Sequence, residues 1–292
     1  MPDSELVLAA PEVLAPLVSS SGMVDGLVDT SGPRTPAWSG PPPDIAVDLH
    51  GRGPESHAAL AALGPGRLIG FGCPELGHPG PVWVPDEHER ERWCRLVNDE
   101  LQVMADPDDV RLDAPSGPAI IPRAVVLHPG AASAARQWPV ERFADVARWA
   151  GAAGLDVAVT GGRDEAGLGR EVARVAGLPS YAVLAGRTDL LQLARQVAAS
   201  RLVVCGDTGV AHLASAFGVP SVVLFGPVPP REWGPPPGGP HVALWKGTRR
   251  GDPHGISVDP ALLEITVGEV VQHAESLLTA TAGSPGDDLQ RL

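Results

Sequence analysis

Cysteine is scarce and long apolar runs are missing from this 292-residue sequence. The three cysteines, Cys73, Cys94 and Cys205, are widely spaced and form neither a CxxC pair nor a disulfide framework. This usage favours a reducing compartment, so we predict a cytoplasmic protein. No stretch of about 18 apolar residues occurs, so no membrane-spanning helix is expected. The first residues, MPDSE, are not basic, so we expect no secretory signal.

Basic residues are also fewer than acidic residues. The chain has 22 Lys and Arg residues against 35 Asp and Glu residues, a formal net charge of −13. Nucleic acids and anionic membranes repel such a chain, so nucleic acid is not an expected partner. Backbone N–H groups and one or two cations can still bind a phosphate locally. Glycine (35 residues) and proline (32) are abundant, but a hydrophobic fraction of 43% argues against disorder.

Several catalytic and cofactor motifs are absent. The glycines do not fit GxGxxG, and the chain has no P-loop (GxxxxGKS or GxxxxGKT) and no GxSxG nucleophile elbow. The nine histidines and three cysteines lack zinc-ligand spacing. The acidic run from Asp106 to Asp109 follows no strand, and we interpret it as solvated loop rather than a metal motif. We therefore predict neither a metal nor a cofactor.

Short apolar runs alternate with helical stretches, which is typical of βαβ units and a parallel sheet. The length allows about two domains of roughly 150 residues. Residues 105–122 contain four prolines and no lasting periodicity. We interpret this segment as a linker and predict domains of residues 1–117 and 118–292. Predicted strands are residues 6–9, 24–28, 45–49, 67–71, 125–127, 155–160, 202–205 and 221–225. Predicted helices are residues 11–19, 55–63, 86–104, 140–150, 165–176, 190–199, 210–217 and 267–278, and residues 283–292 are expected to fray.

The best local signal for a ligand site is the segment VVCGDTGVAHL, residues 203–213. A buried strand enters Gly206, Asp207, Thr208 and Gly209, and a helix comes next. Thr208 is a candidate N-cap, and free N–H groups at a helix N-terminus attract phosphate. His212 lies one turn into that helix. The alternative is an ordinary capped turn with a buried histidine.

Two further strand-to-loop junctions carry candidate residues. In the first, His128 leads into small residues that let the backbone approach a ligand, and Arg136 supplies a cation suited to a diphosphate. The alternative is a surface arginine, with Trp138 as a core anchor. In the second, an acid after Gly161-Gly162 can bind ribose hydroxyls. The alternative is an acid at the helix N-terminus that is stabilised by the helix dipole. All three junctions follow strands of the same half-chain, where ligands of such sheets bind.

These segments resemble glycosyltransferase family 9, the ADP-heptose:lipopolysaccharide heptosyltransferase-like family. The resemblance rests on HPGAASAARQWPVERFADVARW, TGGRDEAG, LAGRTDLLQLARQVAASRLVV and GDTGVAHLASAFGVPSVVLFGPVPPREWGP, which stand in the family's order. It covers about residues 120–235 and extends more weakly to DIAVDLHGRGPES (residues 44–56). It implies a GT-B fold: two Rossmann-like α/β domains with parallel sheets facing an inter-domain cleft. It also implies metal-independent, inverting transfer of a heptose-like sugar from a nucleotide-sugar, which is a substrate and not a cofactor.

The resemblance assigns donor-site roles residue by residue. Asp207, Thr208, Gly209 and His212 match the diphosphate-binding segment, and Arg136 stands where relatives carry a basic residue. Glu165 matches the ribose-binding acid, with Asp164 as the neighbouring alternative. The loop that lines the donor site corresponds to residues 128–133, including His128, Gly130 and Ser133. The implied partners are a nucleotide-sugar, ADP-linked as in the family, and a carbohydrate or glycolipid acceptor that gives peripheral membrane contact.

The sequence departs from the family pattern at its beginning. The family starts with a βα unit whose aspartate is the expected general base, and the segment from Met1 to Val7 matches the part of the family that comes after that unit. Asp3 stands in the wrong context to replace the base, so no catalytic base is assigned. His50 and Arg52 are the acceptor-side candidates, although residues 52–56 differ from the usual basic-Ser pattern. Two alternatives are a catalytically silent nucleotide-sugar-binding protein and, ranked lower, a GT-B-like sugar epimerase.

Overall fold

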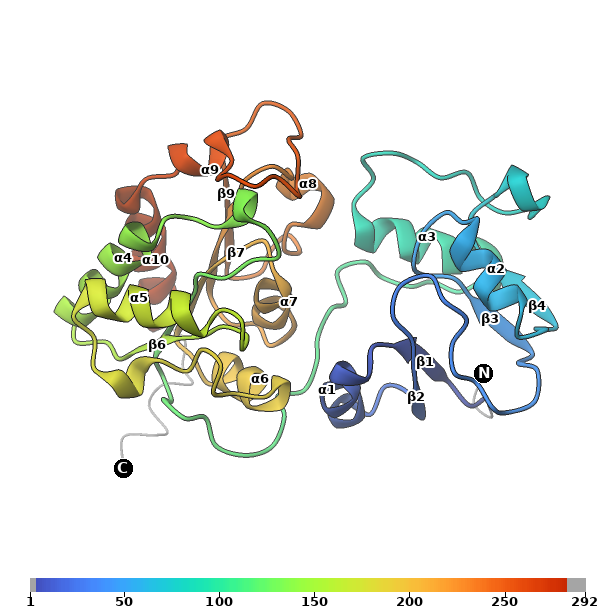
Figure 1. Ribbon diagram of the computed structural model, residues 1–292, viewed down its shortest axis with the longest axis horizontal. Helices are drawn as coiled ribbons and strands as arrows, with labels where there is room; N and C mark the ends of the chain where they lie inside the picture. The colour runs from blue at the N-terminus through green and yellow to red at the C-terminus, as the bar shows by residue number, and fades with distance from the viewer. Residues whose placement is uncertain (1–3, 283–292) are drawn as a thin grey trace. The chain divides into compact units, whose positions relative to one another are not determined.

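The computed structural model describes residues 4–282, so the expectations for Asp3 and for residues 283–292 lie outside it. Contacts divide the chain into two compact units, Met1–Asp109 and Val110–Leu292 (Figure 1). The linker composition places the division near residue 117. The contacts place it earlier, because the N–H of Leu112 donates to the carbonyl of Ala216, 3.0 Å away in the second unit.

The first unit contains two small parallel sheets. Strands β1 (Val7–Ala10) and β2 (Gly26–Asp29) pair in parallel and are joined through helix α1 (Ala15–Ser21). Strands β3 (Ile45–Val47) and β4 (Arg67–Ile69) pair in the same way around helix α2 (Glu55–Ala61). Helix α3 (Glu89–Leu101) comes next. Its Leu96 packs with Ile69 and Phe71 to form the core of this unit.

The second unit is built on a five-stranded parallel sheet in the order β6-β5-β7-β8-β9. The strands are β5 (Val125–His128), β6 (Val157–Val159), β7 (Leu202–Gly206), β8 (Ser221–Phe225) and β9 (His241–Trp245). Apart from β9 they are buried along their whole length, which explains why they stand out in the sequence as apolar runs. The carboxyl ends of all five strands meet at one edge of the sheet, called the carboxyl edge below.

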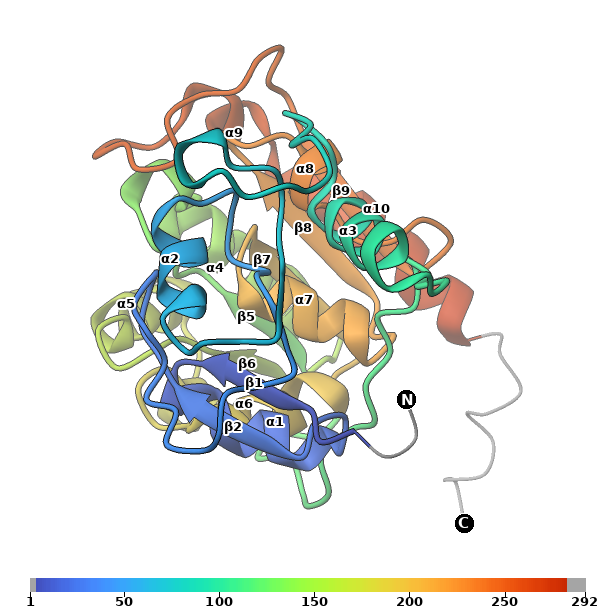
Figure 2. The same ribbon diagram turned by 90° about the vertical axis from the view of Figure 1, so that its right-hand side faces the viewer.

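Helices cover both faces of this sheet (Figures 1 and 2). Helices α4, α5 and α10 lie on one face, and α6 and α7 lie on the other. Apolar side chains of α4, α5 and α10 pack with the strands in a single core that includes Trp138. Their bounds are α4 (Val140–Ala152), α5 (Ala166–Ala176), α6 (Leu190–Ala198), α7 (Gly209–Ala216) and α10 (Val267–Ala282). Within residues 4–282, no helix combines the length and the hydropathy that a membrane span requires.

The predicted α/β class with parallel sheets is confirmed, and the differences concern element ends and short elements. The helix expected over residues 11–19 is a 3-10 turn at Glu12–Leu14 followed by α1. The helix expected over residues 86–104 is shorter because Gln102, with a φ of 56°, ends it. Three elements were missed: β9 and the short helices α8 (Pro230–Trp233) and α9 (Pro260–Glu264). All three come after Pro- or Gly-rich segments whose composition indicates loop.

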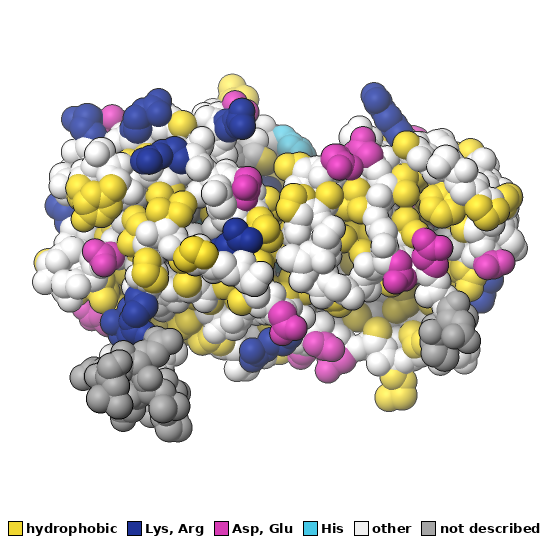
Figure 3. All heavy atoms as spheres, turned by 90° about the horizontal axis from the view of Figure 1, so that it is seen from below, with side chains coloured by type: hydrophobic (Ala, Val, Ile, Leu, Met, Phe, Trp, Pro, Cys, Tyr) yellow, Lys and Arg dark blue, Asp and Glu magenta, His cyan; other side chains and the backbone are white. Residues whose placement is uncertain are grey.

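Acidic and basic side chains are interspersed on the face of the molecule drawn in Figure 3. Basic groups there lie mainly over the second unit. Several of the basic groups of the second unit are held by carboxylates, including Arg148 by Asp145 and Lys246 by Glu269. At these positions the positive charge is offset locally by a neighbouring carboxylate.

Candidate functional site

The candidate donor residues gather at the carboxyl edge of the second unit. His128 ends β5, Thr160 follows β6, and Asp207 follows β7. Strand β5 lies between β6 and β7 in the sheet, so the three junctions are direct neighbours. The structure thus brings together the three loops that the sequence singles out separately.

His128 is buried, and each of its ring nitrogens faces a polar group. Its Nδ1 lies 3.0 Å from Thr160 Oγ1, and the Thr160 hydroxyl donates to the carbonyl of Leu127 over 3.3 Å. Nε2 on the other side of the ring faces Glu165 Oε2 at 4.0 Å. Burial lowers the pKa of His128, although Glu165 acts in the opposite direction, so the ring is neutral at neutral pH.

Glu165 reaches across from the loop after β6 to the loop after β5. Its Oε2 accepts a 2.7 Å hydrogen bond from the N–H of Gly162. A Cβ at Gly130 would stand only 1.9 Å from Glu165 Oε1, so the carboxylate occupies the space that glycine leaves free. The neighbouring Asp164 is exposed. The two acids therefore differ in packing: Glu165 contacts the loop after β5, and Asp164 is exposed.

Arg136 and Asp207 join the loops after β5 and β7. Nη2 of Arg136 donates to Asp207 Oδ2 over 2.7 Å and also to the carbonyl oxygen of Asp207. Burial raises the pKa of Asp207, while Arg136 and His212 act to lower it. Nε of Arg136 is buried and has no hydrogen-bond partner among the described residues. Arg136 is thus a half-buried cation held in place, not the surface arginine of the alternative interpretation.

Helix α7 begins directly after this ion pair. Thr208 occupies the predicted N-cap position in an extended conformation, but its side chain makes no capping hydrogen bond. The N–H groups of Gly209 and Val210 have no intrahelical partner, as at every helix start. His212 is exposed in the first turn, which corrects the alternative of a buried histidine. A cation and open N–H groups at one helix start are the combination that binds a phosphate.

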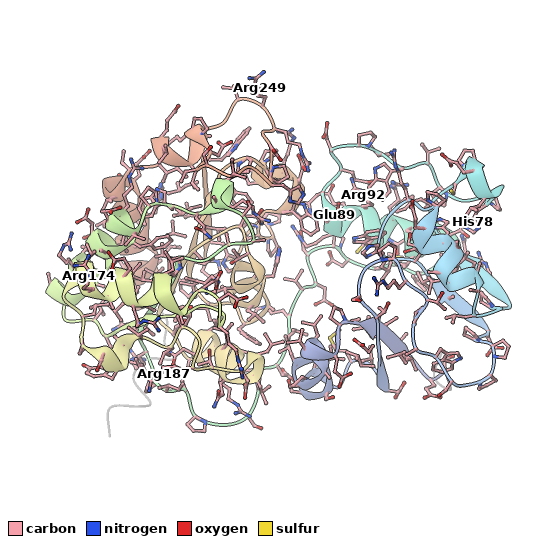
Figure 4. All side chains as sticks on the ribbon, viewed as in Figure 1. His78, Glu89, Arg92, Arg174, Arg187 and Arg249 are labelled. Atoms are coloured by element: carbon pink, nitrogen blue, oxygen red, sulfur yellow. The ribbon has the colours of Figure 1, made fainter. Side chains whose placement is uncertain are left out.

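Ser133 joins the loop after β5 to a distant segment of the same unit. Its hydroxyl donates to the carbonyl of Pro253 over 2.6 Å. Two backbone bonds, from Ala135 to Gly255 and from Asp259 to Ala135, fasten the same pair of segments. Residues 246–259 therefore form a loop over the carboxyl edge, with Arg249 near its tip (Figure 4). Sequence reasoning missed this loop, and only the basic pair Arg249-Arg250 signalled it.

The buried His128 makes the stability of the second unit depend on pH. Its folded pKa is lowered from the ordinary value of 6.5, so below that pH the unfolded chain binds a proton that the folded chain does not. We expect the free energy of unfolding to fall as the pH is lowered through about 6.5. Urea unfolding of the wild type and His128→Asn over a pH series measures this loss. The variant should show a flatter profile, and identical profiles would contradict the assignment.

The acceptor-side candidates lie on one loop of the first unit. His50 and Arg52 are both exposed after β3. The N–H of His50 donates to Asp48 Oδ1 over 2.9 Å, and Asp48 Oδ2 lies 2.7 Å from His57 Nδ1. His57 Nε2 lies 2.8 Å from the carbonyl of Phe71, and both Asp48 and His57 are fully buried. Sequence reasoning missed this pair, which anchors the loop that carries both candidates.

No group of three or more His, Cys, Asp or Glu side chains able to hold a metal occurs between residues 4 and 282. Two α/β units with parallel strands, the second of them a five-stranded sheet with helices on both faces, define the class of a Rossmann-like α/β protein. The family model for glycosyltransferase family 9 (heptosyltransferase) matches residues 91–249, more than half of the chain. The chain belongs to this family, as the sequence motifs predicted.

Curated relatives match only part of their own length. Lipopolysaccharide heptosyltransferase 2 of Salmonella typhimurium is 29% identical over 155 residues, which is 50% of this chain and 43% of the relative. Lipooligosaccharide heptosyltransferase 2 of Haemophilus influenzae is 31% identical over 105 residues, 35% of this chain and 30% of the relative. These matches span less than half of either relative.

Solved structures resemble the chain over most of its length. The E. coli ADP-heptose lps heptosyltransferase II gives a TM-score of 0.72 at 20% identity, over 97% of this chain and 92% of that one. A family 9 glycosyl transferase from Veillonella parvula gives 0.74 at 20% identity, over 96% and 89%. At this identity the likeness shows the fold, and it confirms the predicted fold class.

Proposed function

We propose that this protein transfers a sugar from a nucleoside diphosphate-sugar to an acceptor hydroxyl, with an ADP-linked, heptose-like donor. The observation that carries the proposal is Arg136, held by Asp207 beside the open N-terminus of α7. Glu165 lies at the neighbouring junction, where it suits a ribose hydroxyl. Family membership and relatives named for ADP-heptose and lipopolysaccharide support the donor and a glycolipid acceptor.

In the proposed reaction the acceptor oxygen attacks the anomeric carbon from the face opposite the diphosphate. The new C–O bond forms as the bond to the diphosphate oxygen breaks, so the anomeric configuration inverts. The acceptor proton leaves to a base or to solvent, and the nucleoside diphosphate departs with the bonding electrons. Negative charge grows on the diphosphate, where Arg136 and the N–H groups of Gly209 and Val210 stabilise it. This charge stabilisation comes from protein groups, so no metal is required.

Nucleotide binding and nucleotide release test the proposal separately. Calorimetric titration with ADP, GDP and UDP should show binding, tightest for ADP. ADP-heptose with a deacylated lipopolysaccharide core acceptor should release ADP at a rate that a chelator does not change, and NMR of the product should show an inverted anomeric centre. Binding without release would favour the catalytically silent alternative. Failure to bind any of the three nucleotides would contradict both.

A further inference from the structure

An aromatic side chain stands exposed at the carboxyl edge of the second unit. Trp233 ends the short helix α8, which follows β8, and 41% of its surface is exposed. Its indole ring lies near the imidazole of His212, with 6.2 Å between ring centroids and 56° between ring planes. His212 belongs to the first turn of α7, whose N-terminus is the proposed diphosphate site. The exposed ring is therefore next to the proposed donor site and not on a remote surface.

Contacts of the residues on either side of Trp233 hold the turn that carries it. Its neighbour Glu232 is only 5% exposed, and the Glu232 carboxylate accepts a hydrogen bond from Arg250. The N–H of Gly234 donates to the carbonyl of Pro230 over 2.6 Å, and a Cβ at Gly234 would lie 2.4 Å from that oxygen. A buried carboxylate before the ring and a tight turn after it hold the backbone at Trp233. A fixed aromatic ring loses little conformational entropy when a ligand covers it.

The order of the strands indicates which part of the donor meets this ring. Along the sheet the order is β6, β5, β7 and β8, so Glu165, the Arg136–Asp207 pair and Trp233 succeed one another across the carboxyl edge. Neighbouring strands are about 4.8 Å apart, so three steps span roughly 14 Å. An extended nucleoside diphosphate-sugar covers a similar span. With ribose at Glu165 and diphosphate at Arg136, the sugar reaches the β8 side.

We propose that Trp233 is the platform for the sugar ring of the donor, whose apolar C–H face packs on the indole. This inference rests on the proposed function, because it places the diphosphate at Arg136 and α7. Trp233 is then a specificity-determining residue: it contributes to binding of the nucleotide-sugar but not of the nucleotide alone. A flat aromatic face packs against a ring that presents C–H groups, and it does not distinguish one nucleotide base from another.

Paired titrations of the full chain with ADP and with ADP-glucose test the platform. Trp233→Ala should weaken ADP-glucose binding on the order of tenfold while ADP binding stays within about twofold of the wild type. Trp233→Phe should restore most of the ADP-glucose affinity. Tyr181→Ala is the matched control, since Tyr181 is an aromatic residue 63% exposed on a 3-10 turn of the same unit outside the donor loops. It should change neither affinity.

Other outcomes overturn the inference. Equal weakening of ADP and ADP-glucose by Trp233→Ala would place the ring against the nucleotide or show a structural role. Unchanged binding of both ligands would show that the ring meets no part of the donor. If the wild-type protein binds neither ligand, the proposed function and this inference both fail. That result differs from the loss of ADP-glucose binding in the Trp233 variant alone. Circular dichroism of each variant confirms that the fold is retained.

Discussion

Arg136→Ala is expected to lower the rate of ADP release from a nucleotide-sugar by about 10²–10³-fold. Two causes act together. The diphosphate loses the cation that stabilises its developing charge, and the buried carboxylate of Asp207 loses the guanidinium that it binds over 2.7 Å. An unpaired Asp207 carboxylate next to a diphosphate repels it. The rate is measured under single-turnover conditions, and ADP affinity is measured by calorimetry.

A set of variants separates these two causes. Arg136→Lys keeps the charge but lacks the planar guanidinium whose Nη2 contacts both Asp207 oxygens, so it should retain part of the rate. Adding Asp207→Asn to Arg136→Ala removes the repulsion, and ADP affinity should recover more than the rate does. Arg174→Ala is the matched control, because Arg174 is an exposed arginine on α5 paired with Glu171 (Figure 4). Full ADP affinity in Arg136→Ala would contradict the placement of the diphosphate.

Burial explains why the strands of the second unit were predictable from sequence. A parallel strand covered on both faces, such as β7 or β8, needs apolar residues at every position, and that leaves a continuous run. Strand β9 is only partly buried except at Leu244, unlike the other edge strand β6, and its ends adjoin Pro- and Gly-rich loops. It therefore carries the weakest signal of the five, and it was missed.

Tertiary contacts explain what the motifs did not resolve in the candidate site. The motif TGGRDEAG offers two neighbouring acids, and only the space left by Gly130 distinguishes Glu165 from Asp164. Ser133 is expected to line the donor site, and its hydroxyl also donates to the carbonyl of Pro253, 120 positions away in the sequence. The pairing of Asp48 with His57 depends on the carbonyl of Phe71, which no side-chain pattern reveals.

Asp48→Ala is expected to destabilise the first unit by about 3–5 kcal/mol, the usual cost of removing one partner from a buried ion pair. The carbonyl of Phe71 only accepts, so His57 Nε2 carries a proton. A second proton lies between Nδ1 and the Asp48 carboxylate, because two acceptors do not approach to 2.7 Å without one. Alanine removes the acceptor for that proton and for the N–H of His50. Hydrogen exchange of peptides covering residues 44–73, followed by mass spectrometry, measures the loss.

Asp48→Asn is the matched control for this prediction. Its side-chain oxygen can still accept from the N–H of His50, and its amide can donate to Nδ1 of a neutral His57, so all three hydrogen bonds survive. We expect exchange in the Asp48→Asn variant to be little faster than in the wild type, and exchange in the alanine variant to be much faster. Equal protection in all three proteins would show that the pair contributes nothing to the loop.

Because His50 and Arg52 lie on that loop and the donor candidates lie in the other unit, Asp48→Ala should raise the KM for the acceptor and leave ADP affinity unchanged.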